Sequence, residues 1–380
     1  MPRLLNARTP LALATVALLV GLAAPGIGMA SWRGGWLAVA VGLFAVAAGG
    51  SRRWRGLAFS LWVGAFVVAA MFYPETFRRW GDFELKTLIV PLIQLIMFGM
   101  GTMLNLGDFA RVMRMPRAVL IGIALQFGVM PLSGAALAAA FGFRGEIAAG
   151  VVLIGSCPGG VASNVMTYLS RGNVALSVTM TACSTLVSPL LTPLMMRLLA
   201  GQYIEIDFLQ MMVTILQIII VPITAGLVAN ALLRRFGLRG PWLDRLLSLI
   251  AMAGICYIIA IITALSRDQL LAVGLALIAA AVLHNAAGYL LGYWGARLAG
   301  LGESSRRTVA IEVGLQNGGM ASGLAINVLG SSDAALASAV FGPWMNISGS
   351  LLASWWRGRP TGNGDDGPDP AGPDGQMRTE

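Results

Sequence analysis

Charged side chains are scarce in this sequence. They make up 11% of its 380 residues, whereas hydrophobic residues make up 57%. Soluble globular domains carry about 25% charged residues, so the composition excludes an ordinary soluble domain. Apolar runs long enough to cross a bilayer, about 20 residues each, follow one another almost without interruption. The composition therefore predicts an all-α membrane protein whose spans lie in a lipid bilayer.

Histidine and cysteine are also rare. The single histidine, His284, excludes a multi-histidine metal site. Cys157, Cys183 and Cys256 lie in apolar segments and lack CxxC spacing, which excludes a zinc site of that kind and a disulfide framework. The net charge of +9 comes without a basic patch interleaved with aromatics, so nucleic-acid binding is excluded. We expect no obligate protein partner.

Twelve apolar segments are separated by charged or turn-rich breaks. A cytoplasmic N-terminus would place 19 of the 26 basic residues inside and 7 outside. This bias follows the positive-inside rule and predicts a multi-pass inner (plasma) membrane protein with both termini in the cytoplasm. The segments are 10–30, 35–50, 57–74, 86–105, 117–141, 146–170, 173–199, 208–233, 243–265, 269–297, 305–329 and 333–356.

The two ends of the chain differ from its middle. Arg3 and Arg8, the apolar run after them and the small residues at 28–30 also fit a cleaved signal peptide. We prefer a retained hairpin over residues 1–56, because the run is long for a signal peptide. Residues 358–380 are rich in Gly, Pro and Asp, without an apolar period, and predict a disordered cytoplasmic tail.

Two apolar segments have a polar, glycine-rich centre, and these centres resemble each other: GGVAS at 159–163 and GGMAS at 318–322. Small residues are also common where membrane helices pack closely. Proline and paired glycine, however, interrupt a helix, and the freed backbone groups are tolerated only against protein or a watery cavity. Paired broken helices, one in each half of the chain, are typical of a transporter binding site.

The position of these segments predicts an inverted repeat. Residues 57–200 and 201–357 each hold five spans, and the interrupted span is the fourth in both. An odd number of spans gives the halves opposite orientations. We therefore expect the two broken helices to meet near the middle of the membrane from opposite sides.

Glu312 is the one acid of 17 that lies well inside a span. A charged side chain at that depth costs roughly 2.5 kcal/mol or more, so it indicates a function. The alternative is an ion pair with Arg307 near the cytoplasmic edge. A site with one carboxylate and otherwise neutral oxygens favours a hard monovalent cation, and a proton on Glu312 is the competing interpretation. The neutral oxygen donors we expect beside it are Gln126, Ser163, Asn164, Ser177, Thr181 and Gln316.

Several stretches together resemble the bile acid:sodium symporter family over residues 57–356. They are FGMGTML from Phe98, GSCPGGVASNVMTYL from Gly155, EVGLQNGGMASGLA from Glu312 and NISGSLLA from Asn346. The resemblance implies a ten-helix core of two inverted five-helix repeats, with two crossing broken helices and a panel domain facing a core domain. It also implies two sodium sites and an organic-anion substrate.

The resemblance assigns residues to each site. The first sodium site would use Ser163, Asn164, Ser177, Thr181 and Glu312. The second would use Gln126, Glu312 and Gln316 with the carbonyls of Val313 and Leu315. The substrate would lie near Asn317, Asn346, Gly160 and Gly318.

Two features depart from the family pattern. Met345 stands where the family often has histidine, and the hairpin over residues 1–56 lies outside the ten spans. His284 and Asn285 form a polar pair in an apolar run, for which we prefer an interhelical hydrogen bond over a substrate contact.

The sequence thus predicts a sodium-coupled symporter that works by alternating access. A proton-coupled or uncoupled carrier on the same fold is the first alternative, and a small-molecule-binding membrane receptor that does not transport is the second. An intramembrane enzyme is disfavoured, because no nucleophile–base pair is evident.

Overall fold

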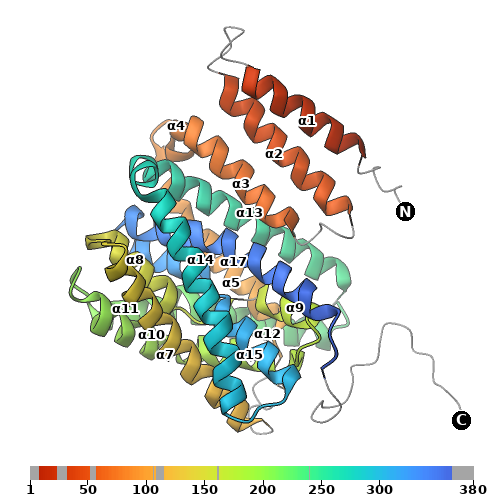
Figure 1. The fold of residues 1–380 in the computed structure, drawn as a ribbon, viewed down its shortest axis with the longest axis vertical. Coiled ribbons are helices and arrows are strands. Elements are labelled where there is room, and N and C mark those ends of the chain that lie inside the picture. Colours follow the sequence, from red (N-terminus) through yellow and green to blue (C-terminus); the bar gives the residue numbers. More distant parts are fainter. Residues whose placement is uncertain are drawn as a thin grey trace, which may run out of the picture.

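The computed structural model describes residues 8–23, 32–51, 57–105, 107, 115–160, 162–238 and 240–361. Over this part the chain is almost wholly helical, and the helices form one bundle (Figure 1). The first group of elements is α1 (Arg8–Ala23), α2 (Arg33–Gly50), α3 (Ala58–Phe72), α4 (Pro74–Arg78), β1 (Arg79–Trp80), β2 (Phe83–Glu84), η3 (Leu85–Leu88) and α5 (Ile89–Met103). The next group is α7 (Pro116–Ala140), α8 (Gly145–Ser156), α9 (Ala162–Leu169), α10 (Val174–Met195) and the π-helical turn η5 (Met196–Ala200). The last group is α11 (Phe208–Ile215), the π-helical turn η6 (Leu216–Ile220), α12 (Val221–Arg235), α13 (Pro241–Leu265), α14 (Arg267–Leu298), α15 (Glu303–Gly314), α16 (Gly318–Asn327) and α17 (Ser332–Arg357).

Each of the twelve predicted apolar segments corresponds to one helix or to two or three consecutive helical elements. Among the described residues, seven helices are long and apolar enough to cross a membrane. Three apolar helices are shorter, namely residues 9–23, 58–72 and 145–156. The structure is therefore an all-α membrane protein with several spans. One of the short helices, residues 145–156, lies in a segment that the sequence predicts to be interrupted.

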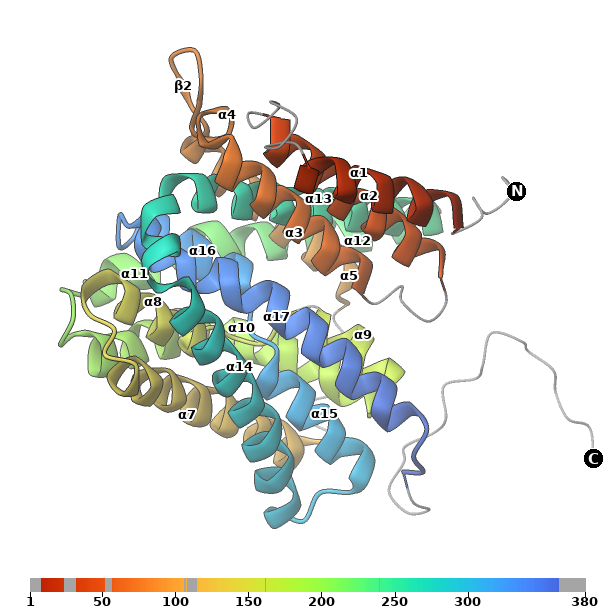
Figure 2. The same ribbon diagram turned by 45° about the horizontal axis from the view of Figure 1, so that its top comes forward.

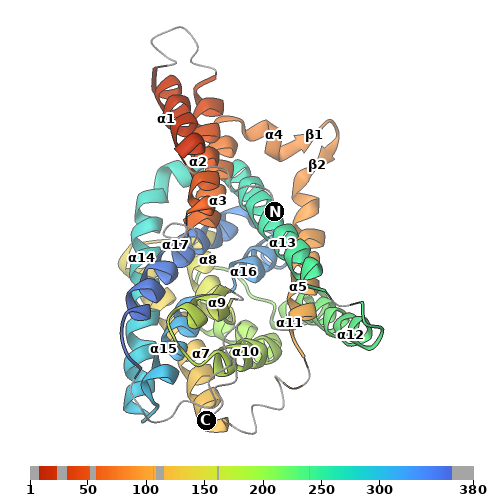
Figure 3. The same cartoon turned by 90° about the vertical axis from the view of Figure 1, so that its right-hand side faces the viewer.

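The N-terminal hairpin of α1 and α2 lies at one edge of the bundle, beside α3 (Figures 1 and 3). Close packing joins α2 to α3: a Cβ added at Gly34 would lie 2.2 Å from the Cβ of Phe72. The backbone N–H of Gly35 donates to the hydroxyl of Tyr73 at 2.9 Å. The hairpin therefore extends the bundle through α3.

Two arginines connect α4 to α13 and the start of α14 to α3. Arg78 donates from Nε to the carbonyl of Ala264 near the end of α13 at 2.9 Å. Arg267 donates from Nε to the carbonyl of Met71 near the end of α3 at 2.8 Å. The last carbonyls of a helix lack intrahelical partners, so each arginine satisfies such a group and ties its own helix to the end of another.

The remaining helices form two packed groups. In one, α5 packs on α12 and α13, and α3 packs on α13. In the other, α14 contacts α7, α15 and α17, while α8 contacts α7 and α17. The second group contains both interrupted helices, α8–α9 and α15–α16 (labelled in Figure 2), and the residues of α8 and α15 that lead into the breaks are buried.

Local sequence explains both interruptions. Cys157 caps α8 in an extended conformation with ψ 154°, as expected for the residue before a proline. In the second interruption, Leu315 is extended with ψ 96°, and the side chain of Asn317 then caps the N-terminus of α16.

Candidate functional site

The two helix breaks lie side by side, and their backbones are paired. Gly159 and Gln316 form an isolated antiparallel bridge. The N–H of Gly160 donates to the carbonyl of Leu315 at 2.8 Å, and the N–H of Asn317 donates to the carbonyl of Pro158 at 2.9 Å. Backbone groups freed by each break are thus satisfied by the other, as their depth requires. Two segments far apart in the sequence therefore cross at one point.

Glycine is required at this crossing by close approach. A Cβ at Gly160 would lie 2.8 Å from the carbonyl oxygen of Gln316. A Cβ at Gly159 would lie 2.7 Å from Oε2 of Glu312. The paired glycines thus bring the first break into contact with both the backbone and the carboxylate of the second.

The carboxylate of Glu312 is the centre of a buried cluster of oxygen atoms, and the residue is only 1% exposed. The hydroxyl of Ser163 lies 2.5 Å from Oε1, and that of Thr181 lies 2.9 Å from Oε2. Ser177 contacts Oε1 as well, and its hydroxyl lies 2.8 Å from Oδ1 of Asn164. All five residues predicted for the first sodium site are therefore joined by hydrogen bonds contributed by α9, α10 and α15.

This cluster has more acceptors than protons. Each of the three hydroxyls has one proton to donate. Besides the carboxylate and Asn164, the carbonyl of Gly160 lies 2.7 Å from the hydroxyl of Ser163, and the carbonyl of Ser177 lies 3.1 Å from that of Thr181. Three hydroxyl protons cannot serve all of these acceptors at once, so the cluster keeps oxygen lone pairs that no hydroxyl proton occupies. A cation ligated by these oxygens would complete the cluster.

Arg307 does not neutralise Glu312. Its Nε donates instead to Oε1 of Glu303 at 2.9 Å. Within the described residues, no lysine or arginine forms an ion pair with Glu312. The structure therefore does not contain the Arg307 pair that the sequence left open.

The residues predicted for the second sodium site are joined through side-chain amides. Nε2 of Gln126 donates to Oε1 of Gln316 at 2.5 Å and to the carbonyl of Cys157 at 3.0 Å. Nε2 of Gln316 donates to the carbonyl of Val313 at 2.6 Å. The carbonyl of Leu315 accepts the N–H of Gly160. The carboxylate of Glu312 forms its hydrogen bonds with the hydroxyls of the first cluster. The amide N–H groups here occupy carbonyls that a cation would need, so binding would require these two glutamines to turn.

The predicted substrate residues lie where α16 begins and packs on α17. Oδ1 of Asn317 accepts from the N–H of Met320 at 3.0 Å, while its Nδ2 is buried and has no hydrogen-bond partner. A Cβ at Gly318 would lie 3.8 Å from Cα of Gly342. Asn346 donates to the carbonyl of that same Gly342 at 2.8 Å. The helix N-terminus, an unpartnered amide donor and the first break are thus close together.

A further set of polar residues supports the second break, and sequence reasoning did not assign all of them. Nδ2 of Asn285 on α14 donates to the carbonyl of Gly314 at 2.8 Å, and Oδ1 of Asn285 accepts from Ser348 on α17. The hydroxyl of Tyr289 lies 3.1 Å from that of Ser348. Asn285 and Tyr289 are spaced i,i+4 in an otherwise apolar helix, so they share one helix face. This spacing is the sequence signal that could have indicated their common role.

His284 and Met345, which neighbour this set in the sequence, also contact the backbone of other helical segments. Nε2 of His284 lies 3.0 Å from the carbonyl of Met130, so both members of the His284–Asn285 pair make interhelical hydrogen bonds, as we preferred. The sulfur of Met345 lies 3.2 Å from the backbone nitrogen of Gln316 and accepts its N–H. The methionine that replaces the usual histidine therefore contacts the break directly.

The chain is similar to known sodium-dependent transporters. The model of the Sodium Bile acid symporter family matches residues 90–273. The uncharacterized sodium-dependent transporter YocS of Bacillus subtilis is 40% identical over 272 residues, which cover 72% of this chain and 84% of that protein.

Plant and animal proteins match as well. The probable sodium/metabolite cotransporter BASS1, chloroplastic, of Oryza sativa subsp. japonica is 37% identical over 72% of this chain and 68% of its own. The ileal sodium/bile acid cotransporter of Oryctolagus cuniculus is 33% identical over 61% of this chain and 67% of its own.

The fold, the crossing breaks and these relatives define a multi-pass membrane protein of a transporter class, not an enzyme. The chain belongs to the sodium bile acid symporter family.

Proposed function

We propose that this protein is a sodium-coupled symporter of an organic anion. The observation that supports this most directly is the cluster around Glu312, where oxygen acceptors outnumber hydroxyl protons around one buried carboxyl group. Hard oxygen ligands with a single carboxylate favour a monovalent cation. Sodium bound there would be a co-transported substrate. Gln126, Val313, Leu315 and Gln316 are proposed as a second sodium site that shares Glu312.

The substrate is proposed to bind beside the crossing, on the side of Asn317. The N-terminus of α16 presents backbone N–H groups and a partial positive charge. The unpartnered Nδ2 of Asn317 adds a donor at the same place. These donors favour an anion, from bile-acid-like molecules to smaller organic acids. Gly160, Gly318 and Asn346 would form the walls of this site.

The mechanism is proposed to be alternating access in a ten-helix core of two inverted repeats, 57–200 and 201–357. The packing of α3, α5, α12 and α13 in one group and of the helices with the breaks in another supports a panel and a core domain. A cavity of about 660 Å³, lined by Arg197, Asp207 and Val328 among others, lies between α11 and the ends of η5 and α16. Movement of one group against the other would open and close such a space.

The membrane arrangement is part of the same proposal. The protein is proposed to lie in the inner membrane with both termini in the cytoplasm, because basic residues concentrate on that side. A reporter fused after Arg55 and active only in the periplasm would contradict this topology.

Uptake into proteoliposomes tests the function. A panel of organic acids, from bile acids to short keto acids, is first screened for thermal stabilisation of the protein with and without sodium. A stabilising acid is then used for uptake under a sodium gradient, a proton gradient or neither. Uptake that requires sodium supports the proposal. Uptake driven by protons, or binding without counterflow, would instead support one of the two alternatives.

A further inference from the structure

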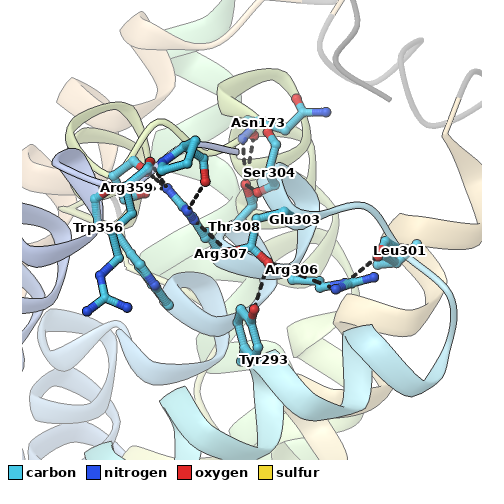
Figure 4. A network of polar contacts seen from close by, with 12 residues as sticks. Asn173, Tyr293, Leu301, Glu303, Ser304, Arg306, Arg307, Thr308, Trp356 and Arg359 are labelled. Atoms are coloured by element: carbon cyan, nitrogen blue, oxygen red, sulfur yellow. Dashed lines mark hydrogen bonds and ion pairs between the residues drawn. The ribbon is translucent and has the colours of Figure 1, made fainter. Parts of the chain in front are cut away.

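The N-terminal half of α15 contacts the short turn between α9 and α10. This turn, Ser170–Asn173, joins two helices that contribute hydroxyls to the cluster around Glu312. It is tightly wound, since Arg171 has a positive φ of 58°. Figure 4 shows Asn173 of this turn beside Arg307 and Thr308 of α15. We call Arg307, Thr308 and the turn the α15 junction.

Thr308 makes the first contact of the α15 junction, and it is fully buried. Its Oγ1 accepts the backbone N–H of Asn173 at 2.7 Å. The hydroxyl proton can go to the carbonyl of Ser304 at 3.0 Å or of Asn173 at 3.3 Å. A Cβ at Gly172 would lie 2.8 Å from this same Oγ1. The turn is therefore held against one hydroxyl with no spare room.

Arg307 makes the second contact. Its side chain is 2% exposed, and it donates to the carbonyl of Ser170 at 3.1 Å. The same guanidinium donates to the carbonyls of Trp356 and Pro360 at the end of α17, at 3.1 and 2.8 Å. Its Nε donates to Glu303, whose other oxygen accepts from Tyr293. Arg307 thus fixes the ends of α9 and α17 to α15 (Figure 4).

The α15 junction is in register with the oxygen cluster. Thr308 and Glu312 are spaced i,i+4 and share one face of α15. Asn173, Ser177 and Thr181 repeat the same spacing along α10. Thr308 contacts Asn173, and one turn further Glu312 contacts Ser177 and Thr181. Two sets of contacts, one helical turn apart, therefore connect α15 to α10. Only the set at Glu312 belongs to the cluster.

We propose that Thr308, assisted by Arg307, is a positioning residue that sets the sodium affinity of the cluster around Glu312. The contact between Thr308 and Asn173 fixes the position of α10 along the axis of α15. It thereby sets the distances from the hydroxyls of Ser177 and Thr181 to the carboxylate. A ligand set must be held within about 0.5 Å of its working geometry to bind well, and this depends on its supporting contacts. The inference rests on the proposed function.

Substitutions at Thr308 test this directly. Thr308→Val keeps the volume and removes the hydroxyl, whereas Thr308→Ser keeps the hydroxyl. The matched control is Thr192→Val on α10, because Thr192 is also buried and donates to the carbonyl of Ser156 on α8 at 2.7 Å. The sodium concentration for half-maximal thermal stabilisation is measured on purified full-length protein, with potassium keeping the ionic strength constant.

We expect Thr308→Val to raise this sodium concentration about tenfold, which corresponds to about 1.4 kcal/mol. Thr308→Ser should stay within about twofold of the wild type on the same scale, and so should Thr192→Val even if its melting temperature falls. Arg307→Lys keeps the charge but cannot form the planar fork, so it should shift the sodium response in the same direction.

The outcomes separate this inference from the function it rests on. If wild-type protein shows no sodium response, the proposed function itself fails. If the wild type responds and Thr308→Val responds at the same sodium concentration, the inference fails and the function stands. Equal shifts in Thr308→Val and Thr192→Val would also overturn it, because they would reflect general loss of stability.

Discussion

The backbone N–H of Gly160 donates to the carbonyl oxygen of Leu315 at 2.8 Å, which joins the break in one interrupted helix to the break in the other. The reciprocal bond runs from Asn317 to Pro158. The two breaks therefore cannot shift independently without leaving polar groups unpaired. The oxygens proposed to bind sodium are contributed by the helices that meet here, so their positions depend on this pairing.

Gly160→Ala tests the crossing. The new Cβ would meet backbone, which moves less easily than a side chain, so we expect about 1–3 kcal/mol of destabilisation and loss of sodium-dependent transport. Thermal unfolding and uptake measure the two effects. The control is Gly128→Ala on α7, where a Cβ would meet nothing within 4 Å. A Gly160→Ala protein as active as this control would show that the breaks do not approach as described.

Asn285→Ala tests the support of the second break. The substitution leaves the carbonyl of Gly314 without its side-chain donor and removes one acceptor from the hydroxyl of Ser348, so we expect about 1–3 kcal/mol of lost stability. The sodium response should weaken as well, because Gly314 directly follows Val313. Chemical unfolding in detergent and sodium titration measure these effects. Unchanged stability would mean that another group satisfies Gly314.

Gln126→Ala separates the two proposed sodium sites. Gln126 contacts Gln316 and the carbonyl of Cys157 and has no hydrogen bond to the hydroxyls that surround Glu312. We expect sodium to stabilise the variant still, through the first cluster, while transport needs a higher sodium concentration than in the wild type. Stabilisation and uptake are measured against sodium concentration. A complete loss of the stabilisation would indicate one joint site instead of two.

Deletion of residues 1–56 tests the N-terminal hairpin. The hairpin packs on α3 and lies away from the crossing, so the shortened protein should keep the sodium response of the wild type. Its melting temperature should fall, because the contact of Gly34 with Phe72 is lost. The two quantities come from one thermal-shift titration. A protein that folds but no longer responds to sodium would give the hairpin a role in binding.

Much of the site could be predicted because its signals are local. Proline and paired glycine interrupt a helix wherever they occur, so Pro158–Gly160 indicated a break from sequence alone. Glu312 was evident because a carboxylate is costly in an apolar segment. The resemblance to the family then placed Ser163, Ser177 and Thr181 beside it, and the structure joins all three to the carboxylate by hydrogen bonds.

What could not be predicted depends on contacts between distant segments. Sequence spacing permitted a pair between Glu312 and Arg307, but the fold directs Arg307 to Glu303 and to carbonyls at the ends of α9 and α17. The roles of Tyr289 and Ser348 at the second break likewise follow from how α14 and α17 pack. Residues 362–380 of the tail predicted at 358–380 lie outside the described residues, and so do residues 52–56, where the predicted hairpin ends.

The measurement that tests the central claim most directly is sodium-induced stabilisation of Glu312→Gln. This change keeps the size of the side chain and removes its charge, so a neutral amide no longer needs a cation. The matched control is Glu146→Gln, a carboxylate on α8 that accepts from Ser331 at 2.5 Å, away from the crossing. We expect a folded Glu312→Gln protein that sodium does not stabilise, while Glu146→Gln and the wild type respond to sodium alike. A Glu312→Gln protein that responds to sodium as the wild type does would contradict the proposed coupling.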